Sequence, residues 1–341
     1  MHEETYLGIN IGGTTTSVVR GNARGEILAR RAQPTTTGDR EAYLSGLIAL
    51  IREIEPRPAR VGVAVGGPLD VTRGLLIDPP HLPHLAGFAL RDRLEADLGT
   101  PVRLHHDAAA CALAEYRWGP NAGSRGLAYF TCGTGFGTGL ILDGTVRYGA
   151  GGQSPEIGHV RFEPGGPSIF EKPGCYEGYA SAKAIGLLYR FFGGEAIESS
   201  AVVDRAAAGD ERARLALFWN VRAVGSACAM LIDLLAVDVI VLGSLATYLG
   251  NTWIAAVREM AGSEAIPRHL ADVTFRAPMP HVQDLSGLAA ALDAPGILAP
   301  WSVSSPAHCS GPLPSPAPAG CGRNCGPMRR SSMSRARTRH R

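Results

Sequence analysis

The sequence predicts an α/β protein made of two related halves, because strands and glycine-rich turns recur in the same order. Tyr6–Ile11 is an apolar run typical of a buried strand, and the turn Gly12–Thr14 follows it. The same order returns in the middle of the chain, where Gly126–Thr131 leads into the turn Gly133–Gly135. Helical patterns alternate with the strands, which is typical of mixed sheets covered by helices. The repeat predicts two lobes that face one central cleft.

Further elements complete each half. The other strands are expected over Thr16–Arg20, Glu26–Arg30, Val61–Val65, Val102–His105, Gly137–Leu142, Thr145–Tyr148 and Val239–Leu242. Apolar residues at helical spacing predict helices over Arg40–Ile54, Leu90–Leu98, Ala108–Tyr116 and Asp210–Leu235. Asp143-Gly144 is a hairpin signal in the second half, and Asp107 stands where the N-cap of a helix is expected.

The composition is that of a globular protein in water. Hydrophobic residues make up 45% of the 341 residues and charged residues 19%. No apolar run is long and uninterrupted enough to suggest a membrane span. Met1–Thr5 lacks the basic flank and apolar core of a signal peptide, and the scattered cysteines form no secreted disulfide framework. We therefore expect a cytoplasmic protein with no membrane partner.

Charge is distributed unevenly along the chain. Seven of the 33 Lys and Arg residues follow Pro295, where there is no Asp or Glu. The rest of the chain is therefore mildly acidic, which argues against a nucleic-acid partner. Residues 295–341 are dense in Pro, Ser and Arg and show little apolar periodicity, so we expect this basic tail to be disordered.

The two glycine-rich turns are candidates for phosphate binding. Glycine allows backbone N–H groups to approach an anion closely, and Thr14 and Thr134 add hydroxyl donors. A single turn of this kind is usually structural. Two turns at matching positions could hold the polyphosphate of ATP between them, and the chain has no Gly-x-x-x-x-Gly-Lys-Ser/Thr phosphate loop.

Asp107 is the candidate catalytic base. It follows His105 and His106 at the point where a strand gives way to a helix. A carboxylate at such a point can accept the proton of an attacking hydroxyl during phosphoryl transfer. It could equally cap the helix, and spacing alone does not decide between the two interpretations.

Four polar residues in the second half form another candidate group. Glu156 and His159 follow a glycine-rich stretch, and Cys175 and Glu177 lie a little further on. Carboxylates and imidazole at this density could bind the hydroxyls of a polyol. His159 and Cys175 could also be half of a metal site, although a buried His and Cys without such a role are the ordinary case.

Seven segments in order resemble the ROK family (repressors, open reading frames and kinases) of the actin-like sugar-kinase superfamily. They are Ile9–Thr14, Gly62–Pro68, His106–Ala110, Gly133–Gly139, Pro155–His159, Gly174–Glu177 and Asp238–Gly243. The resemblance implies a two-lobed actin-like (ribonuclease H-like) fold with a central cleft. The N-terminal lobe would span residues 1–118 and the C-terminal lobe 119–294, followed by the tail 295–341.

The resemblance also implies an activity and the residues that carry it out. Asp107 would deprotonate the primary hydroxyl of a hexose, and ATP with its Mg²⁺ would supply the phosphoryl group. The sugar would be held by Gly66, His106, Asp107, Glu156, His159 and Glu177. The nucleotide would be held by Asn10, Gly12, Gly13, Thr14, Gly133, Thr134, Gly135 and Gly243.

Three departures from the family pattern concern these ligands. Asn10 stands where the family usually has Asp, so Mg²⁺ would be held more weakly or by other groups. His106 replaces the usual Asn, which leaves room for amino sugars or a C7-cyclitol of the valiolone type. Ser244 replaces the second glycine of the segment that meets the adenosine.

A fourth departure concerns the structural zinc that many family members bind through one His and three Cys. His159 and Cys175 remain as remnants, but the other positions are Ser168 and Phe170. Two ligands cannot build a closed tetrahedral site. We therefore expect no structural zinc.

Two functional classes follow from the sequence. The first is an ATP-dependent kinase for the exocyclic primary hydroxyl of a hexose or hexose-like compound, and the resemblance suggests a homodimer or tetramer. The second is a catalytically impaired sugar-binding sensor or regulator. Because the first strand begins at Tyr6, we expect no helix-turn-helix region ahead of it and no DNA-binding repressor.

Overall fold

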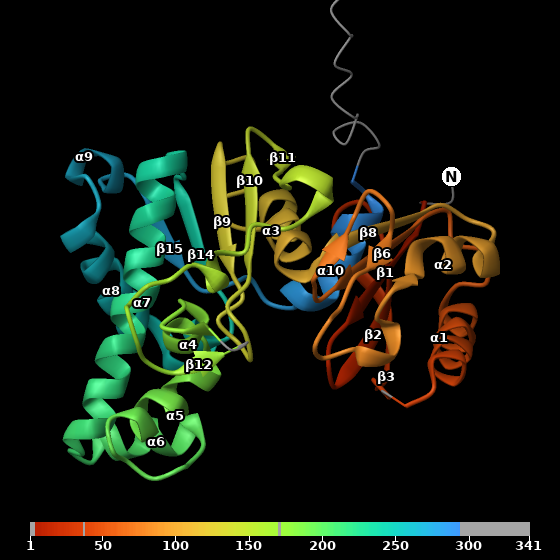
Figure 1. The fold of residues 1–341 in the computed structure, drawn as a ribbon. Coiled ribbons are helices and arrows are strands. Elements are labelled where there is room, and N and C mark those ends of the chain that lie inside the picture. The colour runs from red at the N-terminus through yellow and green to blue at the C-terminus, as the bar shows by residue number, and fades with distance from the viewer. Residues whose placement is uncertain (1–3, 37, 170–171, 294–341) are drawn as a thin grey trace, which may run out of the picture. The chain divides into compact units, whose positions relative to one another are not determined.

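Two five-stranded sheets organise the chain in a computed structural model that describes residues 4–36, 38–169 and 172–293 (Figure 1). The first has the order β3-β2-β1-β4-β8, with β1 (Tyr6–Ile11), β2 (Thr15–Gly21), β3 (Ile27–Pro34), β4 (Val61–Val65) and β8 (Val102–His106). The second has the order β11-β10-β9-β14-β15, with β9 (Gly126–Phe130), β10 (Thr138–Leu142), β11 (Thr145–Val146), β14 (Val239–Leu242) and β15 (Thr274–Arg276). The predicted tail 295–341 lies outside the described residues.

The two sheets have the same topology. In the first, β1 pairs antiparallel with β2 and β2 with β3, whereas β1–β4 and β4–β8 are parallel. In the second, β9–β10 and β10–β11 are antiparallel, whereas β9–β14 and β14–β15 are parallel. The expected duplication of strands is therefore confirmed.

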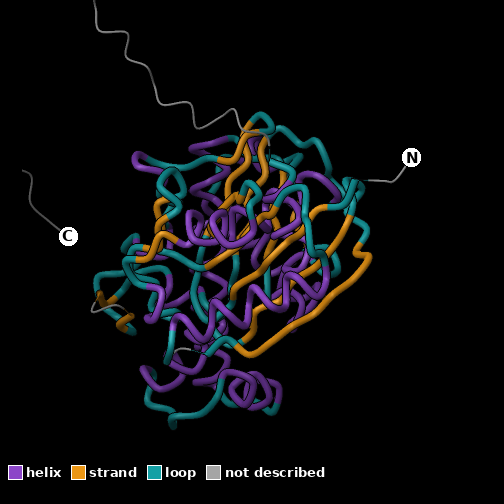
Figure 2. The backbone as a smooth tube through the Cα atoms, turned by 90° about the vertical axis from the view of Figure 1, so that its right-hand side faces the viewer, coloured by secondary structure: helices purple, strands orange, loops and turns teal. Residues whose placement is uncertain are grey.

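Helices cover both sheets. They are α1 (Arg40–Ile54), α2 (Leu90–Leu98), α3 (Asp107–Trp118), α4 (Glu177–Ala180), α5 (Ala182–Phe191), α6 (Ser199–Ala207), α7 (Glu211–Leu235), α8 (Leu245–Glu264), α9 (Pro267–Leu270) and α10 (Val282–Ala291). Figure 2 shows that the lower end of the molecule, where α5 and α6 lie, is helical. Short strands form two small sheets, β5 (Leu69–Asp70), β6 (Leu75–Leu76) and β7 (Phe88–Ala89), and β12 (Ser168–Ile169) with β13 (Lys172–Pro173). Single 3₁₀ turns span Pro83–Leu85, Ala150–Gly152 and Ile157–His159.

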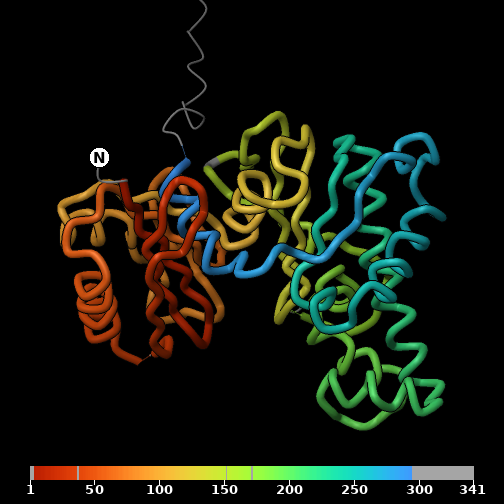
Figure 3. The backbone as a smooth tube through the Cα atoms, turned by 180° about the vertical axis from the view of Figure 1, so that it is seen from behind, coloured from red at the N-terminus to blue at the C-terminus, as the bar shows by residue number. Residues whose placement is uncertain are grey.

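The last helix of each half packs on the other half's sheet. Helix α3 follows the first sheet but lies against β9 and β10, while α10 follows the second sheet but lies against β1 and β4. The two helices also pack against each other. Figure 3 shows α10, in blue, beside the red and orange strands of the first sheet. The division of the chain at residue 118 therefore stays a proposal, and α10 belongs by its contacts to the first sheet.

Glycines make these contacts close. A Cβ on Gly8 of β1 would lie 2.3 Å from the backbone nitrogen of Leu288, and one on Gly62 of β4 would lie 2.1 Å from backbone near the end of α10. On the second sheet, a Cβ on Gly139 would lie 2.1 Å from the carbonyl oxygen of Ala108. At these places helix backbone meets strand backbone directly, which leaves no space for a side chain.

A buried ion pair fixes the far end of α3. The Glu115 side chain is fully buried, and its Oε2 lies 2.7 Å from Nη2 of Arg276 at the end of β15. Its Oε1 accepts the backbone N–H of Met279 at 2.6 Å. Because a buried charge without a partner is costly, this pairing constrains α3 against the segment that leads into α10.

One expectation about membranes is corrected. By length and composition, helix α7 is long and apolar enough to cross a bilayer. From the sequence alone we expect no apolar run of this kind. However, 56% of its most apolar window is buried inside the protein. Its apolar residues belong to the core around the second sheet, as in the core helix of a globular protein.

Replacing Gly62 by Ala should destabilise the protein, because the new methyl group would collide with the backbone of α10. We expect the free energy of unfolding to fall by about 2 kcal/mol or more, measured as a lower urea midpoint. Gly38→Ala is the matched control, since a Cβ at Gly38 would meet nothing within 4 Å. Equal midpoints for the two variants would contradict the close packing of α10 on β4.

Candidate functional site

The candidate catalytic carboxylate lies at the junction of β8 and α3. The N-cap of α3 is His106, without a side-chain capping bond, and Asp107 is the first helical residue. The prediction that Asp107 occupies the N-cap is therefore wrong by one residue, because β8 continues through His106 before the helix begins. An acidic residue in the first turn is still favoured by the partial positive charge of the helix N-terminus.

Asp107 keeps part of its carboxylate available. Its side chain is 41% exposed, and Oδ1 lies 3.2 Å from Nδ1 of His106. The same oxygen accepts the backbone N–H of Ala108 at 2.6 Å. Oδ2 has no hydrogen-bond partner among the described residues, so it is free to accept a proton from a ligand.

His106 touches both halves of the protein. Its residue is 7% exposed. A Cβ on Gly67 would lie 2.9 Å from Cδ2 of the imidazole, and one on Gly137 would lie 3.4 Å from Cε1. The ring therefore lies beside Gly67, which follows β4, and Gly137, which precedes β10. Glycine at both positions gives the imidazole its space.

The second glycine-rich turn is held by its own hydrogen bonds. The hydroxyl oxygen of Thr131 accepts the backbone N–H of Gly137 at 2.8 Å, and Gly133 N–H donates to the carbonyl of Gly135 at 3.0 Å. Gly243 donates its N–H to the carbonyl of Phe130 at 2.7 Å, which brings the segment after β14 to this turn. A Cβ on Gly133 would lie 3.3 Å from Oγ of the neighbouring Ser244. Thr134 itself is exposed.

A buried thiol lies inside this turn. Burial raises the pKa of Cys132, and a backbone hydrogen bond from Gly243 opposes the shift only partly. The thiol is therefore neutral at physiological pH. Since the thiolate is the reactive form of cysteine, Cys132 serves packing rather than chemistry.

Glu177 joins the second turn to the segment that contains Glu156. Its Oε2 accepts the backbone N–H of Phe136 at 3.0 Å, and a Cβ on Gly135 would lie 3.1 Å from the same oxygen. A Cβ on Gly158 would lie 3.3 Å from it as well. Gly158 belongs to the 3₁₀ turn whose N-cap is Glu156. The structure therefore brings the second turn, the Glu156 segment and Glu177 together.

The first glycine-rich turn closes on itself and on β3. Gly12 N–H donates to the carbonyl of Thr15 at 3.0 Å, and the Thr35 hydroxyl donates to the carbonyl of Gly12 at 2.8 Å. Gly13 and Thr14 are exposed, and Asn10 is half-buried. In the described residues we find no direct contact between this turn and the second one. The predicted clamp between the two turns stays a prediction.

One residue beside the first turn, His81, was not predicted from the sequence. The Cβ of His81 would lie 3.0 Å from a Cβ on Gly13. The histidine belongs to the segment between β6 and the 3₁₀ turn at Pro83–Leu85, which carries no recognisable motif. His81 is far from Gly13 in sequence and comes close to it only in the folded protein, so no sequence pattern indicates the contact.

The remaining predicted residues are more loosely placed. A Cβ on Gly66 would meet nothing within 4 Å, which is compatible with a residue that lines ligand space. His159 is exposed, and Cys175 is buried beside Arg161, with which it forms a β-bridge. Among the described residues no group of three His, Cys, Asp or Glu side chains is arranged to hold a metal ion. Phe170 lies outside the described residues, and the absence of zinc remains a prediction.

Relatives of known activity match most of the chain. The sequence profile of the ROK family matches residues 6–292. A glucokinase of Halalkalibacterium halodurans is 27% identical over 81% of this chain and 91% of its own length. An N-acetylmannosamine kinase of Escherichia coli O1:K1 is 32% identical over 64% of this chain and 75% of its own.

Solved structures agree with this match. A ROK hexokinase from Thermus thermophilus superposes with a TM-score of 0.74 at 29% identity, covering 84% of this chain and 97% of the other. A Streptomyces griseus ROK glucokinase in complex with glucose and AMPPNP superposes with a TM-score of 0.68 at 24% identity, covering 84% and 98%. The chain therefore belongs to the ROK family and has its two-lobed actin-like fold, as the seven motifs predicted.

Removing the Thr131 hydroxyl should loosen the second turn. Thr131→Val keeps the shape but leaves the N–H of Gly137 without its acceptor, which costs about 1–3 kcal/mol when the group stays buried. We expect a lower urea midpoint and faster hydrogen exchange of the Gly137 amide. Thr131→Ser keeps the hydroxyl and should retain slow exchange at Gly137. Equal exchange rates in the Val and Ser variants would show that this hydrogen bond does not hold the turn.

Proposed function

We propose that this protein transfers the terminal phosphoryl group of ATP to the exocyclic primary hydroxyl of a hexose or hexose-like compound. The observation that supports it most is the Asp107 carboxylate, which is partly exposed at the start of α3 with one oxygen unpaired. It lies next to His106, whose ring is beside Gly137, two residues after the second glycine-rich turn. Family membership and the sugar kinases among the relatives point to the same reaction.

Asp107 acts as the general base. Its free oxygen accepts the proton of the primary hydroxyl as that oxygen attacks the γ-phosphorus, and ADP leaves. The turns at 12–14 and 133–135 lie against the polyphosphate. The N–H groups of Gly12 and Gly133 donate within the turns, so the backbone N–H groups that follow them stabilise the negative charge. Gly243 lies at the edge of the second turn and meets the adenosine side.

Magnesium enters with the nucleotide. The described residues contain no cage of acidic side chains, and Asn10 offers a neutral amide near the first turn. This donor set fits an ion held mainly by phosphate oxygens and water. When bound, Mg²⁺ neutralises charge on the β- and γ-phosphates.

The sugar lies against Gly66, His106, Glu156, His159 and Glu177. Oε2 of Glu177 accepts the backbone N–H of Phe136, which leaves Oε1 to accept a hydrogen bond from a sugar hydroxyl. His106 is a larger group than the Asn usual in the family, and this favours a glucose-type sugar, an amino sugar or a C7-cyclitol of the valiolone type over strict glucose specificity.

We also propose a partner, a compartment and an oligomeric state for the enzyme. The partner is a small molecule, with no nucleic acid or membrane involved. The protein works in the cytoplasm as a homodimer and requires no zinc. The second candidate is a sensor that binds sugar without turnover, and Asn10 is the observation that favours it. The test is to incubate the protein with Mg-ATP and a panel of hexoses, amino sugars and cyclitols and to look for phosphorylated products by mass spectrometry. A phosphorylated product supports the kinase, whereas sugar binding without any product supports the sensor.

Asp107→Asn should abolish most of the activity, since the amide cannot accept the hydroxyl proton. We expect kcat to fall by at least about 10²-fold with the affinity for the sugar retained, measured by coupled ADP release and by titration calorimetry. Because Asn keeps the size of Asp, the fold should be unchanged. Near-normal turnover in this variant would rule out Asp107 as the base.

Asn10→Asp should strengthen the use of magnesium, because a carboxylate attracts the ion or its water more strongly than an amide does. We expect half-maximal activity at a lower Mg²⁺ concentration than in the wild type. The measurement is initial rate against Mg²⁺ at fixed ATP. An unchanged Mg²⁺ dependence would place residue 10 outside the metal's surroundings.

A further inference from the structure

His105 is a buried histidine that the proposed reaction does not use. Its residue is 5% exposed. Nδ1 lies 2.8 Å from the hydroxyl oxygen of Tyr148, and Nε2 lies 3.3 Å from Oδ2 of Asp293. The three residues come from β8, from the segment after β11 and from the segment after α10. They form one chain of polar contacts directly behind the β8–α3 junction.

Tyr148 serves as a partner for an edge strand. Strand β8 is the last in the first sheet, so one side of its backbone has no neighbouring strand. The hydroxyl of Tyr148 lies 2.8 Å from Nδ1 of His105, so the tyrosine holds this strand through one of the strand's own side chains. The tyrosine ring packs on the core of the first sheet. This also explains why the strand predicted over Thr145–Tyr148 ends at Val146, since Tyr148 turns toward β8.

The contacts of His105 favour one arrangement of protons. Burial raises the pKa of Tyr148, so its hydroxyl stays protonated and can donate to Nδ1 of His105. In the tautomer that accepts from Tyr148 at Nδ1, Nε2 carries the proton and faces Oδ2 of Asp293 at 3.3 Å. A carboxylate at one nitrogen selects the tautomer that leaves the other nitrogen as an acceptor. The chain of contacts therefore runs from Tyr148 through His105 to Asp293.

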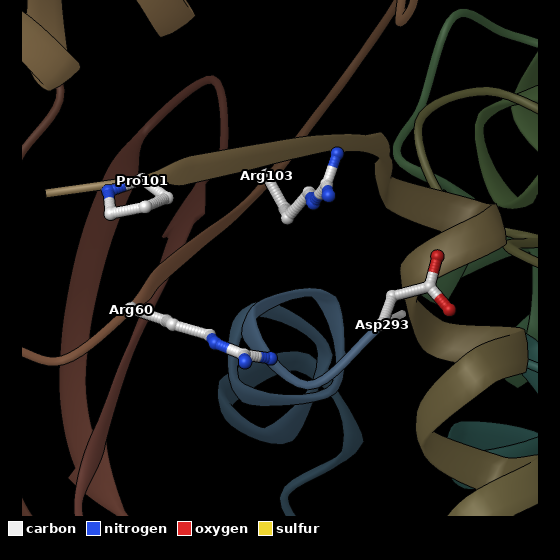
Figure 4. Close-up of a pocket in the computed structure, with 4 residues that line it drawn as sticks. All are labelled: Arg60, Pro101, Arg103 and Asp293. Carbon is white, nitrogen blue, oxygen red and sulfur yellow. The ribbon is translucent and has the colours of Figure 1, made fainter. Parts of the chain in front are cut away.

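The surroundings of Asp293 do not compete with this contact. Asp293 lines a cavity of about 210 Å³ together with Arg60, Pro101 and Arg103. Both arginine side chains extend toward the Asp293 side of this cavity (Figure 4). Neither forms an ion pair with a described acidic residue, whereas Asp293 pairs with His105.

We propose that His105 and Tyr148 position the catalytic carboxylate of Asp107, with Asp293 fixing the imidazole tautomer. The inference rests on the proposed function, in which Asp107 is the base. His105, whose ring is held by Tyr148 on one side and Asp293 on the other, is two residues before Asp107. Loss of the Tyr148 contact therefore frees the end of β8, whose backbone sets the direction of the carboxylate. A displacement of about 1 Å at such a place can cost up to about 10²-fold in rate.

Two substitutions of His105 separate its two contacts. His105→Asn keeps an oxygen near the position of Nδ1, so it can still accept from Tyr148, whereas His105→Gln reaches toward Asp293 but loses the Tyr148 contact. We expect Tyr148→Phe and His105→Gln each to lower kcat about tenfold, with KM for ATP and sugar within about twofold of wild type. His105→Asn and Asp293→Asn should lose about threefold or less. The double variant H105Q/Y148F should be no slower than either single one, because both changes break the same bond.

Tyr189→Phe is the matched control. Tyr189 is also buried, and its hydroxyl donates to Asp210 at 2.7 Å in the helical part of the chain. It should lose stability but keep wild-type kcat at a temperature where all variants are folded. Wild-type kcat in Tyr148→Phe, or losses that multiply in the double variant, would overturn the proposal.

Hydrogen exchange gives a readout that does not need activity. Exchange of peptides that cover residues 102–110, followed by mass spectrometry, should be faster in Tyr148→Phe and His105→Gln than in Tyr189→Phe. Unchanged exchange there would overturn the proposal even if the wild type turned over no sugar. A wild type without product but with the expected exchange would instead contradict the proposed function while leaving the structural role of Tyr148 in place.

Discussion

The direct contact of helix backbone with strand backbone is the constraint on which the rest of the structure depends. At Gly8 and Gly62 the strands approach α10 so closely that a single methyl group has no room, and Gly139 approaches the first turn of α3 in the same way. Each helix thereby lies on the sheet of the other half. A third core, with residues from α3, α10 and both sheets, fills the space between the sheets.

This arrangement determines where the candidate site lies. The N-terminus of α3 is held against β10 by the Gly139 contact, and its far end is held by Glu115 and Arg276. Asp107 is therefore fixed where the end of β8 in the first half meets Gly137, between the second glycine-rich turn and β10. His106 and Glu177 extend the same set of contacts, one beside Gly137 and the other on the N–H of Phe136. The candidate base, the second glycine-rich turn proposed to bind phosphate and the sugar-binding candidates His106 and Glu177 are thus linked by one set of contacts.

The sequence predicted what is encoded locally. The buried run Val61–Val65 and the helix Arg40–Ile54 were predicted with their correct bounds, because apolar spacing acts over a few residues. The start of α3 was missed by one residue, since Asp107 resembles a cap in sequence but lies inside the helix. The packing of α3 and α10 on the sheet of the other half could not be predicted. It depends on single glycines that form no recognisable sequence pattern, and α10 is far in sequence from the strands that it covers. His81 beside Gly13 and the Tyr148–His105–Asp293 contacts were missed for the same reason.

The placement of α10 has a consequence for how the chain is made. The first sheet consists of strands that leave the ribosome early, but the helix that covers one of its faces ends at Ala291, near the end of the described chain. Until that helix has been synthesised, the face of β1 and β4 that it covers stays exposed, because no earlier segment packs there in its place. The order of synthesis therefore leaves the N-terminal half incomplete for most of translation, in a state that is open to aggregation or to capture by chaperones.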